Sequence, residues 1–246
     1  MTVHFIGAGP GAPDLLTLRG RDLIRASGLI VYAGSLIPTE LLAHAPAEAR
    51  TLDTQNLTLD QIVDAIAAAH ADGHDVARLQ SGDLSIYSAL AEQTRRLDDL
   101  GIPWDVTPGV PAFAAASAAI GRELTLPEVA QTVILTRYQR RSTAMPEGED
   151  LASLAAHRTT LVLHLAVHAV AELVPKLLES YPADCPVAVV ARASWPDEAI
   201  LWATLGSLAE FVERAGIRRT AIIVVSPALA ANTSGESHLY SAERTR

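Results

Sequence analysis

The sequence is nearly devoid of cysteine and is short of basic residues. Cys185 is the single cysteine among 246 residues, which excludes an internal disulfide framework and any cysteine-rich metal site. Lysine and arginine together number 19 against 28 aspartates and glutamates, giving a net charge of −9. General binding to nucleic acid or to anionic membranes is therefore not expected. An anionic substrate would need a local basic patch.

Long apolar runs are missing too, although hydrophobic residues make up 49% of the chain. Alanine supplies much of that share, and charged residues interrupt each apolar run before it could span a bilayer. A predicted strand begins within a few residues of the start, which leaves no room for a signal peptide. We therefore expect a cytoplasmic protein without membrane attachment, built as one large domain or two small ones.

A glycine-rich turn follows the first apolar run. Residues 3–7 are predicted to form a strand, and Gly7, Gly9 and Gly11 then lead into an amphipathic segment at 15–26. Glycine in such a turn permits positive φ and lets a ligand approach the backbone. We expect this turn to face a small molecule, and a turn that serves only strand-to-helix packing is the alternative.

The same turn partly matches the fingerprint of dinucleotide-binding proteins. Pro10 and Pro13 remove two N–H donors where a pyrophosphate would need them. The second predicted strand, at 29–32, is also not followed by the acidic residue that would hold a ribose. Both departures disfavour a nicotinamide or flavin enzyme.

Strand and helix signals alternate through the first half of the chain. This order predicts a mostly parallel sheet with helices on both faces. Ligands of such sheets bind beyond the carboxyl ends of the strands, where the turns at 7–11, 82–83 and 108–109 can converge. The predicted strands are 3–7, 29–32, 50–52, 75–80 and 104–107, and the helices are 15–26, a short one from Pro38, 58–71, 86–100 and 111–120.

The second half predicts a mixed sheet, because two strands at 187–191 and 200–205 follow one another as a hairpin. Together the halves predict two α/β domains, at 1–125 and 126–230, followed by a flexible tail at 231–246. The other predicted elements are strands at 132–136, 159–165 and 221–225 and helices at 168–180 and 208–215.

Four short motifs stand in a specific order along residues 3–225. They are the Gly-x-Gly-Pro-Gly turn with the following Asp14-Leu15-Leu16-Thr17-Leu18, the Gly82-Asp83 turn, Pro108-Gly109-Val110, and Thr160-Leu161-Val162-Leu163. In this arrangement the chain resembles the S-adenosylmethionine-dependent tetrapyrrole methyltransferases of the corrin and siroheme pathways. Residues 32–38 are in addition similar to a segment of the family members that methylate precorrin-4 at C-11.

The resemblance implies a kidney-shaped fold of two domains, a homodimer, and S-adenosylmethionine bound in a cleft between the domains. It also implies which residues contact this cofactor. Pro111 stands where relatives often carry a hydroxyl, Leu165 where they often have methionine, and Ala193 where they often have glycine. The implied cofactor-binding residues are Pro10, Ser81, Gly82, Asp83, Ile86, Pro111, Ala112, Leu165 and Ala193.

Methyl transfer from a sulfonium to an electron-rich carbon needs alignment more than side-chain chemistry. No obligatory nucleophile or metal is expected, and no catalytic residue is assigned. His164 and His168 are four residues apart, but His164 closes a predicted strand, so a shared metal is not expected. Asp83 either orients the cofactor or caps the following helix.

A tetrapyrrole substrate carries many carboxylates, which favours arginine side chains in its binding site. Arg137, Arg140 and Arg141 form the densest basic stretch, and they either bind the substrate or belong to a solvated loop. The expected activity is methylation of precorrin-4 at C-11. Alternatives are another precorrin position, cobalt-precorrin-4 or uroporphyrinogen III as substrate, an oxidoreductase, or a protein that binds a tetrapyrrole without converting it.

Overall fold

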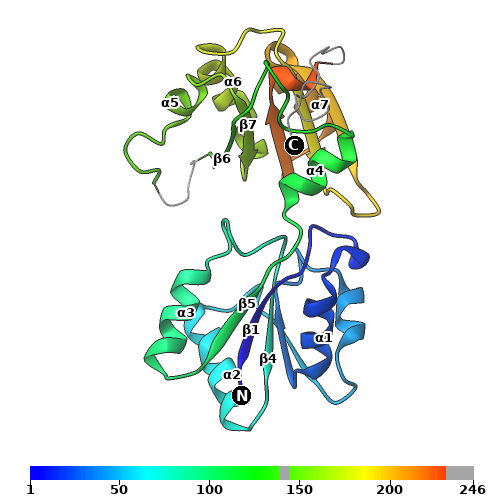
Figure 1. Ribbon diagram of the computed structural model, residues 1–246, viewed down its shortest axis with the longest axis vertical. Coiled ribbons are helices and arrows are strands. Elements are labelled where there is room, and N and C mark those ends of the chain that lie inside the picture. Colours follow the sequence, from blue (N-terminus) through cyan, green and yellow to red (C-terminus); the bar gives the residue numbers. More distant parts are fainter. Residues whose placement is uncertain (139–143, 231–246) are drawn as a thin grey trace, which may run out of the picture. The chain divides into compact units, whose positions relative to one another are not determined.

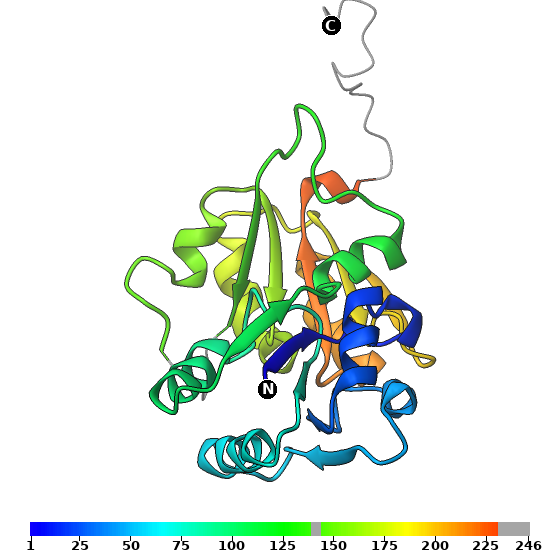
Figure 2. The ribbon, with the colours of Figure 1, turned by 60° about the horizontal axis from the view of Figure 1, so that its bottom comes forward.

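The structure is a computed structural model that describes residues 1–138 and 144–230. The chain forms two compact units, each containing one sheet and its helices (Figures 1 and 2). The first unit comprises Met1–Ala115 and Ser194–Pro196, and the second comprises Ala116–Ala193 and the chain from Asp197 onward. The domain boundary between residues 125 and 126 stays a prediction, and the predicted tail lies outside the described residues.

The sheet of the first unit is entirely parallel, as the alternation of strands and helices predicts. Its strand order is β3-β2-β4-β1-β5, so that β1 lies between β4 and β5. Three consecutive carboxyl ends therefore lie next to one another at one edge of this sheet. The strands are β1 (Val3–Gly7), β2 (Leu29–Tyr32), β3 (Arg50–Asp53), β4 (Val76–Gln80) and β5 (Trp104–Thr107).

Helices cover both faces of this sheet (Figure 1). Ile24 of α1 packs with one face, whereas Ile66 of α2 and Leu97 of α3 pack with the other. Local sequence sets two of the helix starts. The hydroxyl of Thr17 accepts a hydrogen bond from the N–H of Gly20, and Thr58 forms a capping box with Gln61. The helices that cover this sheet are α1 (Leu18–Ala26), α2 (Leu59–Ala71) and α3 (Leu90–Asp99), whereas α4 (Ala112–Ile120) begins in the first unit and ends in the second.

Helix α3 begins four residues later than the prediction at 86–100. Tyr87 and Ala89 both have a φ of 54°, a left-handed conformation that cannot continue a right-handed helix. The hydroxyl of Ser88 donates to the carbonyl of Leu84 at 2.7 Å. Residues 84–89 therefore form a loop on the carboxyl side of β4 where the sequence predicted the first turn of a helix.

The sheet of the second unit is mixed, in the order β6-β7-β10-β8-β9. Strands β6 and β7 are parallel, and the other neighbours are antiparallel. The pairing of β8 with β9 confirms the predicted hairpin. The strands are β6 (Val133–Arg137), β7 (Thr160–His164), β8 (Pro186–Ala191), β9 (Ala199–Thr204) and β10 (Ala221–Val225).

Helices α5, α6 and α7 pack against one face of this mixed sheet. Helix α5 was not predicted, because five residues are too few to show a periodicity. Within the described ranges, no helix is both long and apolar enough to cross a membrane. The helices are α5 (Leu151–Ala155), α6 (Val170–Leu178) and α7 (Leu208–Ala215), and the 3-10 helices of the chain are η1 (Pro13–Leu15), η2 (Thr39–His44), η3 (Val167–Ala169), η4 (Leu205–Ser207) and η5 (Pro227–Leu229).

Candidate functional site

Three glycines pack against one another at the carboxyl ends of β1, β4 and β5. A Cβ atom on Gly7 would lie 2.5 Å from the backbone nitrogen of Gly109. A Cβ atom on Gly109 would overlap the carbonyl oxygen of Gly82, which belongs to rigid backbone. The turns can therefore converge only because Gly7 and Gly109 lack a side chain, whereas Gly82 has room for a Cβ but a φ of 71°, which favours glycine. This convergence is what the sequence predicted for turns that follow adjacent parallel strands.

Backbone hydrogen bonds join the first two turns. The N–H of Gly82 donates to the carbonyl of Gly9 at 2.7 Å, and the N–H of Gly9 donates back at 3.2 Å. The N–H of Ala8 is also used, because it donates to the carbonyl of Gln80 at 2.8 Å. With Pro10 carrying no N–H, the first turn does not present the row of amide donors that a pyrophosphate requires. The geometry thus supports the sequence argument against a dinucleotide site.

Asp83 connects the second turn to the third. One carboxylate oxygen accepts from the N–H of Ser85 and the other from the N–H of Gly109, both at 2.8 Å. Partial burial acts to raise the pKa of Asp83, but hydrogen bonds from Ser85, Gly109 and Leu84 outweigh it and lower the pKa below 3.8. Both carboxylate oxygens are thus hydrogen-bonded to the protein, and Asp83 fixes the spacing of the turns.

A segment distant in sequence covers the first turn within the same unit. The indole Nε1 of Trp195 donates to the carbonyl of Pro10 at 2.8 Å, and the hydroxyl of Ser194 accepts from the N–H of Ala12 at 2.9 Å. Gly11 has no room for a Cβ because the Trp195 ring occupies that space. Sequence reasoning placed these two residues in the loop of a hairpin and had no signal for this contact.

The surroundings of the glycines suit a ligand with both apolar and polar parts. Ile86, Pro111 and Ala112 are half-buried around the second and third turns, and Ser81 is exposed beside them. The amide Nε2 of Gln80, the last residue of β4, is buried and has no hydrogen-bond acceptor among the described residues. A buried donor without an acceptor is the kind of group that a bound ligand can satisfy. These residues therefore fit an adenosyl compound.

The remaining predicted site residues belong to the second unit. Leu165 follows β7 with a φ of 52° and is 63% exposed, and Ala193 is buried after β8. Arg137 ends β6, where it pairs in register with His164 of β7. Arg140 and Arg141 lie outside the described residues. The structure thus gathers the predicted residues of the first unit at one edge of its sheet and places the others at strand ends of the second unit.

His164 is a buried histidine at the carboxyl end of β7, whereas His168 lies in η3. Burial lowers the pKa of His164 from 6.5 to about 4, so its imidazole is neutral at physiological pH. Among residues 1–138 and 144–230, no three histidine, cysteine or acidic side chains are grouped so that they could hold a metal ion.

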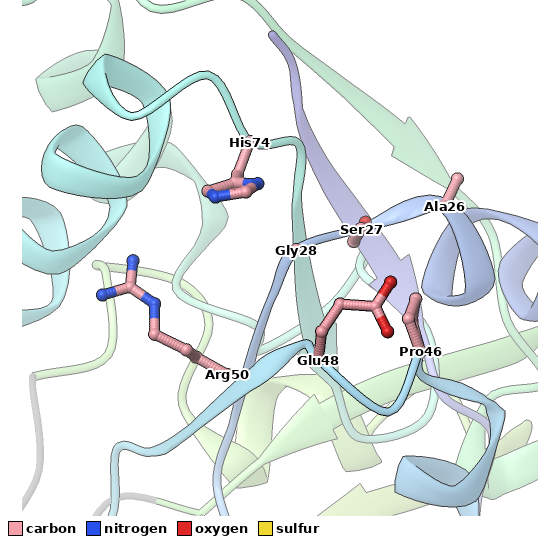
Figure 3. A pocket seen from close by; sticks show the side chains of 7 residues that line it. All are labelled: Ala26, Ser27, Gly28, Pro46, Glu48, Arg50 and His74. Atoms are coloured by element: carbon pink, nitrogen blue, oxygen red, sulfur yellow. The ribbon is translucent and has the colours of Figure 1, made fainter.

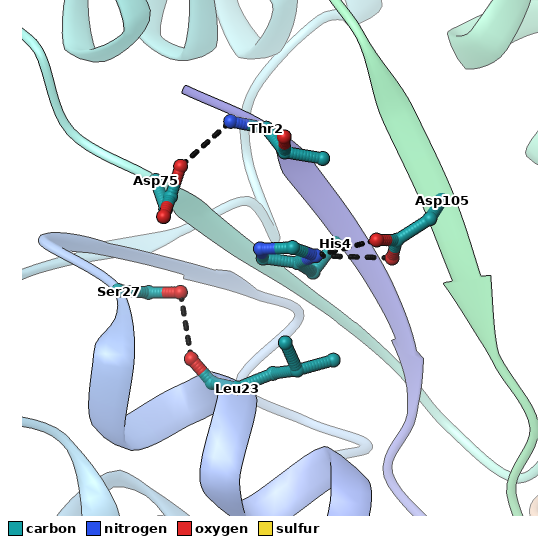
Figure 4. A network of polar contacts seen from close by, with 6 residues as sticks. All are labelled: Thr2, His4, Leu23, Ser27, Asp75 and Asp105. Atoms are coloured by element: carbon teal, nitrogen blue, oxygen red, sulfur yellow. Dashed lines mark hydrogen bonds and ion pairs between the residues drawn. The ribbon is translucent and has the colours of Figure 1, made fainter.

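Hydrogen bonds that involve side chains lie at the opposite edge of the first sheet. The N–H of Thr2 donates to Asp75 at 2.7 Å, and Nδ1 of His4 lies 2.9 Å from a carboxylate oxygen of Asp105 (Figure 4). In the same region the hydroxyl of Ser27 donates to the carbonyl of Leu23. These contacts lie at the amino ends of the strands. They stabilise the edge of the sheet that faces away from the glycine turns.

A pocket of about 280 Å³ lies at this amino edge (Figure 3). Figure 3 shows the carboxylate of Glu48 and the guanidinium of Arg50 among its lining side chains. The lining residues precede or begin strands, whereas parallel α/β sheets bind ligands at the carboxyl ends. We therefore do not place the functional site here. The lining residues are Ala26, Ser27, Gly28, Pro46, Glu48, Arg50 and His74.

Comparisons with known proteins identify the family. The model of the Tetrapyrrole (Corrin/Porphyrin) Methylases matches residues 2–209. A precorrin-4 C(11)-methyltransferase of Rhodococcus erythropolis is 54% identical over 246 residues, covering 100% of this chain and 99% of the relative.

Comparisons with solved structures indicate the same family. The X-ray structure of a cobalt-precorrin-4 methyltransferase has a TM-score of 0.90 at 36% identity and covers 93% of this chain and 96% of its own. A uroporphyrin-III C-methyltransferase of Thermus thermophilus, complexed with S-adenosylhomocysteine, has a TM-score of 0.78 at 27% identity, covering 96% and 97%. The protein is a methyltransferase that belongs to the tetrapyrrole (corrin/porphyrin) methylase family.

Proposed function

We propose that the protein transfers a methyl group from S-adenosylmethionine to C-11 of precorrin-4, giving precorrin-5 in cobalamin biosynthesis. The observation that carries the proposal is the 54% identity with a precorrin-4 C(11)-methyltransferase over the whole of both chains. The glycine turns of the first unit support it, because their surroundings fit an adenosyl compound.

S-adenosylmethionine supplies a methyl group on a sulfonium, and the electron pair of the breaking C–S bond remains on sulfur as the new C–C bond forms. In the first unit we propose Pro10, Ser81, Gly82, Asp83, Ile86, Pro111 and Ala112 as the residues that hold it, and in the second unit Leu165 and Ala193. The complex of the Thermus relative with S-adenosylhomocysteine supports this assignment of the methyl donor.

The contribution of the protein is alignment. Holding reacting groups in line can lower a barrier by about 7–11 kcal/mol, which is enough for a donor and an acceptor that are both already activated. The hydrogen bonds of Asp83 and the close packing of Gly7, Gly82 and Gly109 keep the turns rigid. A rigid backbone surface needs no reorganisation when the reaction begins.

Arg137 is our proposed contact for the substrate carboxylates. It ends a strand that is parallel to β7, so its side chain originates where the parallel pair β6 and β7 has its carboxyl ends. An arginine fork binds carboxylates in a bidentate way that lysine cannot reproduce. Arg140 and Arg141 are proposed for the same role from the sequence alone.

Cobalt-precorrin-4 is the second candidate substrate, because a structural relative at 36% identity acts on it. The test is a turnover assay with methyl-labelled S-adenosylmethionine and, separately, precorrin-4 and cobalt-precorrin-4. One added methyl at C-11 of the metal-free substrate, located by carbon-13 NMR, is the expected result. Preferred turnover of the cobalt form would replace the first substrate by the second. Tight binding of S-adenosylhomocysteine without methyl transfer to either compound would mean that the protein methylates a different tetrapyrrole.

We also propose that the protein forms a homodimer. Ile200 and Trp202 lie on β9, an edge strand of the second sheet, and are 40% and 46% exposed. A subunit contact would remove these side chains from water and cover the strand edge. Analytical ultracentrifugation tests the proposal, and a monomer at micromolar concentration would contradict it. The cytoplasmic location stays a prediction.

A further inference from the structure

A buried arginine lies beneath the glycine turns, and the mechanism above does not use it. Arg78 is only 6% exposed and belongs to β4, where it pairs in register with Phe5 of β1 and Val31 of β2. Phe5 and Val31 belong to the apolar cluster that α2 and α3 cover, so Arg78 lies on the same face. An arginine in such surroundings is costly unless its guanidinium is well partnered.

The partners of Arg78 are neutral. Its Nε donates to Oε1 of Gln93 at 3.0 Å, and Nη1 lies 3.5 Å from the hydroxyl of Thr54. Among the described residues, no carboxylate lies within ion-pair distance of it. Burial lowers the pKa of Arg78 to about 10, so the group is still a cation at physiological pH. A cation kept in an apolar layer without an anion indicates a role beyond packing.

The guanidinium determines which way the Gln93 amide points. Arginine can only donate hydrogen bonds, so the amide must turn its oxygen toward Arg78 and its NH₂ group away. That NH₂ group donates to the carbonyl of Ala89 at 2.8 Å. Gln93 is itself buried in the first turn of α3. Arg78 therefore acts, through one amide, on a backbone carbonyl of the loop at residues 84–89.

This loop is held in an unfavourable conformation. Tyr87 and Ala89 both have positive φ, which places a Cβ close to the backbone and costs free energy at each residue. Such a conformation persists only when surrounding contacts hold it in place. The bond from Gln93 to Ala89 is one contact that supports it, and the bond from Ser88 to Leu84 is another. The loop carries Ile86 and continues directly from Asp83.

We infer that Arg78 is a positioning residue that, through Gln93, holds the loop at residues 84–89 in its left-handed conformation and so shapes the methyl-donor site. The inference rests on the proposed function for the identity of the ligand. The conformation of the loop can be measured without any ligand.

The discriminating variant is Gln93→Glu. A glutamate keeps an acceptor for Arg78 and gives it a charged partner, but it has no NH₂ group for the carbonyl of Ala89. We expect unchanged or higher stability in urea, faster hydrogen exchange of the amides at 84–89, and S-adenosylhomocysteine affinity lowered about tenfold, the loss of one well-placed hydrogen bond. If Arg78 and Gln93 served only stability, exchange and ligand affinity would not change while stability in urea is kept.

Three further variants complete the test. Thr54→Val removes the other acceptor of Arg78 and should lower stability while leaving exchange at 84–89 and ligand affinity unchanged. Ala89→Gly added to Gln93→Glu should recover at least about threefold of the lost affinity, because glycine adopts positive φ without a Cβ penalty. Arg78→Leu should loosen the loop as Gln93→Glu does, since the amide can then rotate.

Unchanged exchange at 84–89 in Gln93→Glu would overturn the inference, and so would equal loosening by Thr54→Val. The proposed function fails separately, if the unaltered protein does not bind S-adenosylhomocysteine. In that case the exchange measurements still decide whether Arg78 positions the loop.

Discussion

The two units end their neighbouring parallel strands differently. In the first unit the turns beyond β1, β4 and β5 carry Gly7, Gly82 and Gly109, which pack backbone against backbone. In the second unit β6 ends at Arg137 and β7 at His164, which are side chains with chemistry of their own. A site made of backbone tolerates almost no added atoms, whereas a site made of side chains can be altered gradually. Substitutions should therefore abolish binding in the first unit and tune it in the second.

The largest effect is expected from Gly109→Ala. The added methyl would overlap the carbonyl oxygen of Gly82, and neither backbone can move without separating the turns. We expect S-adenosylhomocysteine affinity to fall at least about 100-fold, consistent with overpacking costs of about 1–3 kcal/mol or more. Isothermal titration calorimetry measures this change.

The matched control is Gly28→Ala at the amino edge of the same sheet. Its methyl would lie 2.5 Å from Nδ1 of His74, an exposed side chain that can rotate away. Affinity should stay within about twofold of the unaltered protein. Equal losses in the two variants would show that the carboxyl edge is no more sensitive than the rest of the unit.

Acid should destabilise the second unit through His164. Its pKa is about 4 when folded against the ordinary 6.5 of a histidine in the unfolded chain, so the unfolded state binds more protons between these limits. Stability is therefore complete above about pH 6.5 and is lost as the pH falls toward 4, by about 3 kcal/mol. Urea unfolding from neutral pH to about pH 4 measures the loss. His164→Gln should flatten this part of the profile, and parallel profiles for both proteins would refute the assignment.

A smaller effect is expected from Asp83→Asn. One amide oxygen can replace one carboxylate oxygen, but the NH₂ group then faces the N–H of Ser85 or Gly109. Leaving such a donor unpaired costs about 1–3 kcal/mol, which should appear as weaker S-adenosylhomocysteine binding together with lower stability. The control is Asp64→Asn, the same substitution at an exposed position of α2 away from the turns, which should leave affinity unchanged. Full affinity in Asp83→Asn would mean that the turns hold their spacing without it.

The smallest effect is expected from Arg137→Ala. If Arg137 contacts one carboxylate of the substrate, KM should rise about tenfold while S-adenosylhomocysteine binding is unchanged. The difference in KM between the variant and the unaltered protein should shrink at high ionic strength, because salt weakens the attraction between Arg137 and the substrate carboxylate in the unaltered protein. Arg137→Lys should restore part of the affinity. An unchanged KM would leave the arginine as part of a solvated strand end.

Elements with local signals were predictable. The capping box of Thr58 and Gln61 sets the start of α2, and the alternation of strands with helices implies the parallel order of the first sheet. The three glycine turns could be predicted to converge for the same reason. The predicted start of α3 was wrong. Tyr87 and Ala89 adopt a left-handed conformation there, and a side-chain hydrogen bond from Gln93 to the carbonyl of Ala89 supports it, which apolar periodicity does not reveal.

The class of fold, the convergence of three glycine turns at one edge of the first sheet, and the family could all be predicted from the sequence, since each depends on short motifs and on their order. Three contacts could be found only in the folded chain: Trp195 covers the first turn, Asp83 uses both oxygens on backbone N–H groups, and Gln93 bridges Arg78 and the carbonyl of Ala89. The contacts of Trp195 with Pro10, of Asp83 with Gly109 and of Arg78 with Gln93 join residues 15 to 185 positions apart, and the bond from Gln93 to Ala89 depends on which way a single amide points. Neither leaves a trace in periodicity or composition, because both are set by packing in three dimensions.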